Sequence, residues 1–226
     1  MPVSSKQVQV PSKTDRIVAA FDFDGTISTS DSLRDFVRHA VGPGRFALGL
    51  VRASPWLLGM FLGTSDRAAA KARFLAATLG GVTQPKLDEM AREYAETRLP
   101  LLIRPDMLAR IREHQQRGHR LVMVSASPAL YLKYWASTAG FDTVLATELE
   151  FRDGRFSGRL ASPNCWGPQK VQRLQQWFGN DRPPSLYAYG DSRGDREMLA
   201  LADHAWLRGS AAMPEIDAWA KSSAKR

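Results

Sequence analysis

Short apolar segments alternate with helical patterns along much of this chain, and that alternation restricts its fold more than any other feature. The segments have the nearly unbroken apolar character of buried parallel strands, and they are residues 17–23 (IVAAFDF), 121–124 (LVMV), 143–146 (TVLA), 186–189 (LYAY) and, more weakly, 205–207. Helical patterns separate the later ones, at residues 105–117, 128–138, 168–178 and 195–202. The alternation predicts an α/β fold with a doubly wound, mostly parallel sheet, in which ligands bind beyond the carboxyl ends of the strands.

Residues 33–100 interrupt this alternation because they contain helical patterns and no strand candidate. The candidate helices cover residues 32–41, 46–62, 66–79 and 84–99. We therefore predict a small all-helical cap domain, residues 33–100, inserted after the first strand of a core formed by residues 16–32 and 101–220. Residues 1–15 are predicted to be a disordered tail, and residues 221–226 a basic tail.

Two further segments carry local signals. Residues 148–160 predict a β-hairpin, because ELEFR and RFSGRL flank Asp153-Gly154, a dipeptide suited to a type I′ turn. Residues 46–62 are the most apolar stretch, but Arg52 and Pro55 interrupt it and it is shorter than the roughly 20 residues of a spanning helix. Two short buried helices meeting near Pro55 are the preferred interpretation, with an interfacial membrane helix as the alternative.

The formal net charge of +8 is concentrated at the ends of the chain. Residues 1–16 carry +2 and residues 221–226 carry +3, so +3 remains for the body. No nucleic-acid partner is therefore expected, whereas a mildly basic body suits an anionic substrate. Cys165 is the only cysteine, which excludes an intramolecular disulfide, and the N-terminus lacks the apolar region of a secretory signal, so we expect a cytoplasmic location.

Asp22 and Asp24 follow the first predicted strand and are the strongest local signal for chemistry. Alternation along an extended chain places both carboxylates on one side, and Gly25 allows a tight turn after them. One carboxylate can attack phosphorus while the other protonates the leaving oxygen, and their shared negative charge calls for a divalent cation. The alternative role of such a pair is a turn and helix cap.

Ser125 and Lys170 are candidate ligands of a phosphoryl group. Ser125 ends the second predicted strand, and its hydroxyl is free to donate if Ser127, followed by Pro128, caps the next helix. Lys170 lies in the first turn of a predicted helix, where a cation opposes the helix dipole, so helix stability does not explain it. Its other interpretation is a lysine that extends to solvent.

Asp191 and Asp195, in the segment GDSRGD after the strand LYAY, complete the set of acidic candidates. Asp191 at the strand end can bind the cation, and Asp195 either caps the next helix or supports the metal site. Asp22, Asp24 and Asp191 offer the hard oxygen ligands that Mg²⁺ prefers.

FDFDGT, VSAS, Lys170 and GDSRGD resemble, in this order, the four motifs of haloacid dehalogenase superfamily phosphatases, over about residues 17–207. The helical insertion, with ELEFRDGRFSGRL and NCWGPQK, resembles subfamily IB, which contains phosphoserine phosphatase. The resemblance implies a Rossmann-like core, an aspartyl-phosphate on Asp22 and Asp24 as the general acid/base. It also implies that the Asp24 main-chain carbonyl and the side chains of Asp22 and Asp191 bind Mg²⁺, that Asp195 orients this site, and that Ser125 and Lys170 hold the phosphoryl oxygens.

The resemblance is less informative about the substrate, for which we expect a small soluble phosphomonoester such as phosphoserine. Asp31 stands where phosphoserine phosphatases usually carry a glutamate, and GDSRGD departs from their usual GDGxND. Asp31 and Arg73 are our specificity candidates in or near the cap, with Arg67 and Lys71 as further basic candidates. The alternative for the basic residues is a solvated helix face, and for Asp31 a helix cap.

Two other functions are considered. Hydrolysis of a lipid phosphate of the phosphatidylglycerophosphate type, with peripheral membrane contact, would explain the apolar residues 46–62. A catalytically silent binding module, or a nucleic-acid binder that uses the basic tails, would keep the fold without the chemistry.

Overall fold

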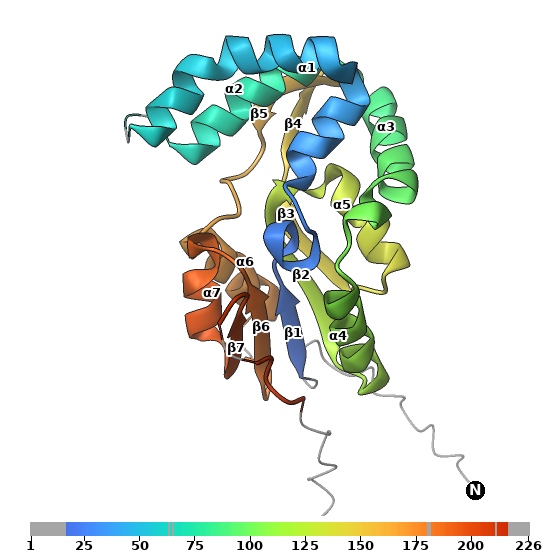
Figure 1. Cartoon of the computed structure of the whole chain (residues 1–226), viewed down its shortest axis with the longest axis vertical. Coiled ribbons are helices and arrows are strands. Elements are labelled where there is room, and N and C mark those ends of the chain that lie inside the picture. The colour runs from blue at the N-terminus through green and yellow to red at the C-terminus, as the bar shows by residue number, and fades with distance from the viewer. Residues whose placement is uncertain (1–16, 63, 65, 180–181, 211, 217–226) are drawn as a thin grey trace, which may run out of the picture.

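Five parallel strands form the central sheet in the order β3-β2-β1-β6-β7 (Figure 1). They are β1 (Val18–Phe21), β2 (Arg120–Pro128), β3 (Thr143–Thr147), β6 (Leu186–Gly190) and β7 (His204–Leu207). The computed structural model describes residues 17–62, 64, 66–179, 182–210 and 212–216, and it confirms all five predicted strands. The chain order reverses at β1, so the switch point, where ligands bind in such sheets, lies beside the Asp22 motif.

Helices cover both faces of the sheet, which confirms the doubly wound fold. Val18 and Ala20 on β1 belong to an apolar cluster with α6 (Pro168–Phe178) and α7 (Arg196–Leu201). The alternate residues Ala19 and Phe21 belong to a second cluster, which includes side chains of α4 (Pro105–Gln116) and α5 (Ala129–Thr138). Both sets are buried because successive side chains of a strand point to opposite faces, so β1 needs to be apolar throughout.

The helices α1 (Ser32–Phe61), α2 (Arg67–Leu79) and α3 (Gln84–Thr97) are inserted between β1 and α4, and we call them the cap helices (Figure 1). A short 3₁₀ turn at Leu99–Leu102 follows them. They lie over the end of the sheet at which β1 stops, so the inserted segment is helical as expected.

Helix α1 differs from the prediction at one of its two expected breaks. It bends at Gly42, where φ is 75°, which is a conformation that glycine adopts at low cost. It then continues through Pro55, so the predicted meeting of two helices there is wrong. Pro55 has no N–H for the carbonyl of Val51, and the Ser54 hydroxyl donates to that carbonyl at 2.7 Å instead. No helix of the described residues is long and apolar enough to cross a membrane.

The predicted hairpin is present as β4 (Leu149–Arg152) and β5 (Arg155–Leu160), which pair antiparallel. Asp153 and Gly154 between them have φ values of 50° and 70°, as a type I′ turn requires. The hairpin joins the cap layer, since the Phe156 carbonyl accepts the Gly81 N–H at 3.0 Å just beyond α2. Strands from the second half of the sequence therefore extend the helical insertion.

Candidate active site

The candidate site lies between the carboxyl end of the sheet and the cap helices. A cavity of about 370 Å³ opens there. Eight residues proposed from the sequence line it, namely Asp22, Asp24, Asp31, Arg67, Lys71, Ser125, Lys170 and Asp195. Asp191 lies beside them, where the Thr26 hydroxyl links it to Asp22 through contacts of 3.4 Å and 3.1 Å. Thr26 is in the quoted FDFDGT motif, but no local pattern in the sequence indicates this linking role.

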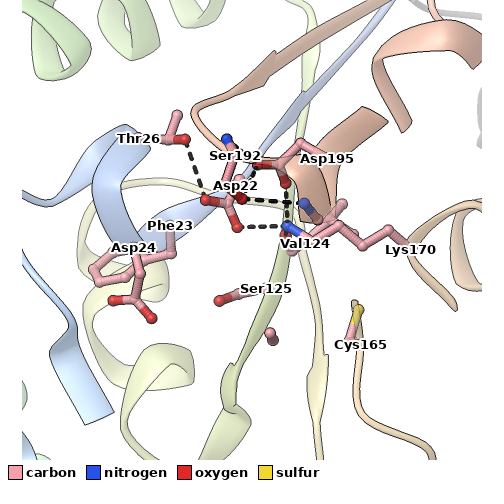
Figure 2. Close-up of polar contacts among 12 residues, drawn as sticks. Asp22, Phe23, Asp24, Thr26, Val124, Ser125, Cys165, Lys170, Ser192 and Asp195 are labelled. Carbon is pink, nitrogen blue, oxygen red and sulfur yellow. Dashed lines mark hydrogen bonds and ion pairs between the residues drawn. The ribbon is translucent and has the colours of Figure 1, made fainter. Parts of the chain in front are cut away.

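Lys170 is the centre of the polar contacts in the site (Figure 2). Its Nζ donates to Asp22 Oδ1 at 2.5 Å, to Asp195 Oδ1 at 2.6 Å and to the Val124 carbonyl at 2.9 Å. Burial by itself would lower the pKa of Lys170, but the two carboxylates reverse that effect and raise the pKa above its ordinary value. Lys170 is therefore a buried ammonium group held in place by three acceptors, rather than a lysine that extends to solvent.

The Asp22 carboxylate is almost fully buried at the end of β1. Burial raises its pKa to about 7, an effect that Lys170 opposes and that Asp195 and Asp24 reinforce. A nucleophilic carboxylate must be ionised, so this excess of negative groups calls for an additional positive charge in the working site.

Gly25 allows the loop after β1 to approach the end of β6. Its φ is 80°, and a Cβ at this position would overlap the Asp191 carboxylate. A larger residue would therefore have to displace Asp191 from Asp22.

Asp22, Asp191 and Asp195 form an acidic group that could hold a cation. Each offers a carboxylate oxygen, and these three oxygens lie within 4.8 Å of one another. Hard oxygen ligands in this number fit Mg²⁺, which completes its coordination with water or substrate oxygens. The structure adds Asp195 to this group, whereas the prediction gave it only a supporting or capping role. The capping alternative is wrong, because Asp195 makes no side-chain cap bond to α7. Its Oδ2 instead accepts the Ser192 N–H at 3.0 Å, within the short 3₁₀ turn Arg193–Asp195 that precedes α7.

The Asp24 carboxylate is held apart from the acidic group by different partners. Its Oδ1 accepts the Ser32 N–H at 2.8 Å, and its Oδ2 accepts the hydroxyl of Ser127. Burial, followed by the charge of Asp31, raises the pKa of Asp24. A carboxyl group with a raised pKa in this position suits proton donation to a leaving oxygen.

Ser127 is not the helix cap that the sequence suggested. Strand β2 continues to Pro128, and α5 begins at Ala129 without a side-chain cap. The Ser127 hydroxyl donates instead to the Asp24 carboxyl group. The buried Ser125 Oγ accepts the Ser127 N–H at 3.1 Å, so it keeps its own proton for donation.

Lys71 reaches the cavity from the cap helix α2. Its Nζ donates to the Ala126 carbonyl at 2.6 Å and to Asn164 Oδ1 at 2.7 Å, both outside the cap helices. Burial lowers its pKa to about 8, although Asp24 and Asp31 oppose this. The sequence showed Lys71 only as one of three basic cap residues, since the face of α2 that turns inward depends on tertiary packing.

The remaining specificity candidates have different surroundings. Asp31 lines the cavity and its Oδ1 also accepts the Arg34 N–H at 2.9 Å, so both interpretations of Asp31 fit the geometry. The Arg67 guanidinium lies over the Trp166 ring, 5.3 Å from its centroid, and both residues line the cavity. Arg73 lies over the Trp56 ring at 4.7 Å, and it is not among the residues that line the cavity. The role predicted for Arg73 stays a prediction without support from this position.

Comparison with known proteins identifies relatives over most of the chain. The sequence profile of the family described as haloacid dehalogenase-like hydrolase matches residues 19–200. Protein CicA of Caulobacter vibrioides is 38% identical over 193 residues, which cover 85% of this chain and 86% of that protein. A protein of Mycobacterium tuberculosis named as a probable phosphatase, Rv3661, is 26% identical over 84% of this chain and 68% of its own length.

Solved structures share the fold. A Bordetella pertussis protein of unknown function superposes with a TM-score of 0.74 at 24% identity, covering 85% of this chain and 89% of its own. A substrate-bound phosphoserine phosphatase superposes with a TM-score of 0.61 at 16% identity, covering 86% of each chain.

Proposed function

Because this chain belongs to the haloacid dehalogenase-like hydrolase family and is a phosphatase, we propose that it is a Mg²⁺-dependent phosphomonoesterase with Asp22 as nucleophile. The observation that carries this proposal is the buried Asp22 carboxylate, held by Lys170 beside Asp191 and Asp195. The expected substrate is a small soluble phosphomonoester such as phosphoserine.

In the proposed first step, an Asp22 oxygen forms a bond to phosphorus while the bond from phosphorus to the leaving oxygen breaks. Asp24, whose pKa is raised by burial, donates its proton to that oxygen. Lys170 and the Ser125 hydroxyl donate hydrogen bonds to the phosphoryl oxygens and stabilise their charge. The product alcohol then leaves, and a phosphoryl group remains on Asp22.

In the second step, Asp24 takes a proton from a water molecule as the water oxygen attacks phosphorus. The bond between phosphorus and Asp22 breaks, and inorganic phosphate is released. Mg²⁺, held by Asp22, Asp191 and the Asp24 carbonyl with Asp195 in support, would supply the positive charge that keeps Asp22 ionised beside phosphate.

A phosphomonoester with an apolar leaving group is a second candidate substrate. The cap side of the cavity is favourable for it, because five apolar residues face the space where a leaving group would lie, namely Leu33, Leu50, Leu57, Ala70 and Phe74. Lipid phosphates belong to this class. Phosphate release from a panel of phosphorylated amino acids, sugars, nucleotides and lipid phosphates would separate the two candidates.

The covalent step is tested by rapid quenching with a ³²P-labelled substrate from that panel. We expect labelled protein from the wild type and none from Asp22→Asn, which conserves shape but removes the nucleophile. Circular dichroism of both proteins checks that the variant is folded. Near-normal turnover by folded Asp22→Asn would refute the proposed role of Asp22.

A further inference from the structure

The second half of α1 exposes an apolar row on its outer side. Leu48, Val51 and Leu58 are 47%, 68% and 62% exposed, and Leu62, directly after the helix, is 78% exposed. With the exposed Pro55 they recur every three or four residues, so they share one face of the helix. We call these five residues the outer row. In Figure 1, α1 runs along the upper edge of the molecule, above α2.

The inner side of the same helix is apolar as well. Phe46 and Ala53 are buried, and Leu50 and Leu57 line the cavity. The contacts of these inner residues hold α1 against the rest of the protein, so that packing does not require the outer row. Single exposed leucines are ordinary in soluble proteins, but a continuous row on an otherwise well-packed helix indicates an interaction surface.

Positive charge borders the outer row without local compensation. The sequence has no acidic residue between Asp35 and Asp66, whereas Arg38, Arg45 and Arg52 fall within this segment. Arg45 and Arg52 are exposed, and their spacing of seven residues puts both on one flank of the row. An apolar face bordered by arginines is the pattern of helices that lie in the interface of anionic membranes.

We propose that the outer row is a docking surface for a bilayer that contains anionic lipids. Helix α1 would lie parallel to the bilayer, with Leu48, Val51 and Leu58 in the acyl boundary and Arg45 and Arg52 among the headgroups. This surface is separate from the catalytic residues, so docking does not depend on the identity of the substrate.

Two other occupants fit less well. A second copy of this chain, packed row against row, would bring the arginines of both copies close together, and the segment offers no carboxylate to neutralise them. Insertion across a bilayer is not supported, since none of the described helices combines the length and apolarity that spanning requires. An anionic surface satisfies both the apolar row and its basic flank.

Docking is tested by flotation of the full chain with vesicles. One set contains phosphatidylcholine alone, and in the other part of this lipid is replaced by phosphatidylserine. We expect the protein to float with the anionic vesicles, and the bound fraction to fall as salt is added, because screening weakens the contribution of the arginines. Absence of flotation with anionic vesicles overturns the proposal.

Matched variants separate the outer row from other sources of binding. Leu58→Glu should weaken binding at least about tenfold, since it removes a leucine that the bilayer would bury and adds a negative charge. Leu101→Glu is the control, because Leu101 is also highly exposed, at 73%, but lies in the 3₁₀ turn after α3 and not in the outer row. This variant should bind vesicles like the wild type. Arg52→Glu should weaken binding about fivefold or more, and Arg112→Glu, at an exposed site on α4, is its control.

The basic tails are unchanged in all four variants, so binding that survives Leu58→Glu undiminished assigns the membrane contact to the tails and overturns the proposal. Equal losses of vesicle binding for Leu58→Glu and Leu101→Glu also overturn the proposal. Analytical ultracentrifugation without lipid tests whether the outer row packs against a second copy of this chain instead of a bilayer. Self-association of the wild type that Leu58→Glu abolishes would assign the outer row to a second copy. Melting temperatures and aryl phosphatase activity of each variant check that the fold is retained.

Discussion

At the scale of single residues, the two carboxylates of the first motif differ because their partners differ. Asp22 faces the ammonium of Lys170, whereas Asp24 is held by the Ser32 N–H and the Ser127 hydroxyl. Burial raises both pKa values, but only the Asp22 side chain belongs to the acidic group that suits a cation. One environment therefore favours an ionised nucleophile once a cation is bound, and the other favours a carboxyl group that keeps its proton.

Asp24→Asn is expected to lower turnover by about 10²–10⁴-fold for alkyl phosphates, because an amide cannot protonate the leaving oxygen. Aryl phosphates with acidic leaving groups should lose much less, since their oxygen departs without a proton. Steady-state kinetics with one substrate of each kind measures the difference. Equal losses on both substrates would contradict the proton-donor role.

Lys71 is expected to make substrate binding weaker at alkaline pH. Its pKa is lowered to about 8, so in the folded protein its charge is present below pH 8 and lost above it. If Lys71 attracts the anionic substrate, KM should rise above pH 8. Lys71→Arg keeps a charge at all these pH values, so the rise should disappear in that variant. A KM profile that is the same in wild type and Lys71→Arg would show that Lys71 has only a structural role.

At the scale of secondary-structure elements, α4 is joined to the sheet through a buried histidine. His114 Nε2 lies 2.8 Å from the Tyr189 hydroxyl on β6, and its Nδ1 lies 2.8 Å from Nδ1 of His119. Burial, with a smaller contribution from His119, lowers the pKa of His114 to about 2. The folded protein therefore holds this ring neutral throughout the physiological pH range.

This burial should make the protein less stable in acid. Between pH 2 and 6.5 the unfolded chain binds a proton at His114 that the folded chain does not, so the free energy of unfolding rises with pH in this window and falls on acidification below 6.5. The slope is up to about 1.4 kcal/mol per pH unit for one such group.

His114→Phe should reduce that slope and also cost about 1–3 kcal/mol at neutral pH, because Tyr189 and His119 lose their partner. Some slope should remain, since burial lowers the pKa of His119 as well. Urea unfolding of wild type and variant at several pH values from 5 to 7.5 measures both effects. An unchanged slope in the variant would contradict the predicted linkage.

At the scale of the whole molecule, the site is assembled from segments that meet only in the folded chain. Asp22 comes from the end of β1, Lys170 from α6 and Asp191 from the end of β6, while Lys71 reaches in from the cap helices. The acidic residues are close enough to repel one another, so a cation bound there should stabilise the whole fold as well as permit catalysis.

Removal of Mg²⁺ is therefore expected to abolish activity and to lower the melting temperature. At a free concentration of about 100 times its Kd, Mg²⁺ would add about 2.7 kcal/mol to the free energy of unfolding. Asp191→Asn should lose most of this stabilisation. Asp153→Asn, in the exposed turn of the hairpin, should retain it, because a type I′ turn accepts asparagine. Full activity in excess chelator would refute the metal requirement.

The sequence by itself determined the features that depend on neighbouring residues. The apolar run before Asp22 is a strand because each side chain along it can be buried on one face or the other, and Asp153-Gly154 forms the turn because both residues accept positive φ. Motifs after successive parallel strands also meet at one edge of a sheet, which is why Asp22, Ser125 and Asp191 could be grouped before the fold was known.

Only the tertiary structure decided the features that depend on contacts between distant segments. The Ser127 hydroxyl donates to Asp24, 103 positions earlier in the chain, instead of capping α5. Lys71 bonds to Asn164, 93 positions away. The apolar pattern of residues 46–62 could not say which side of α1 the rest of the protein would cover. A local pattern describes the surfaces that a segment offers, whereas the partner of each surface depends on which distant segment packs against it.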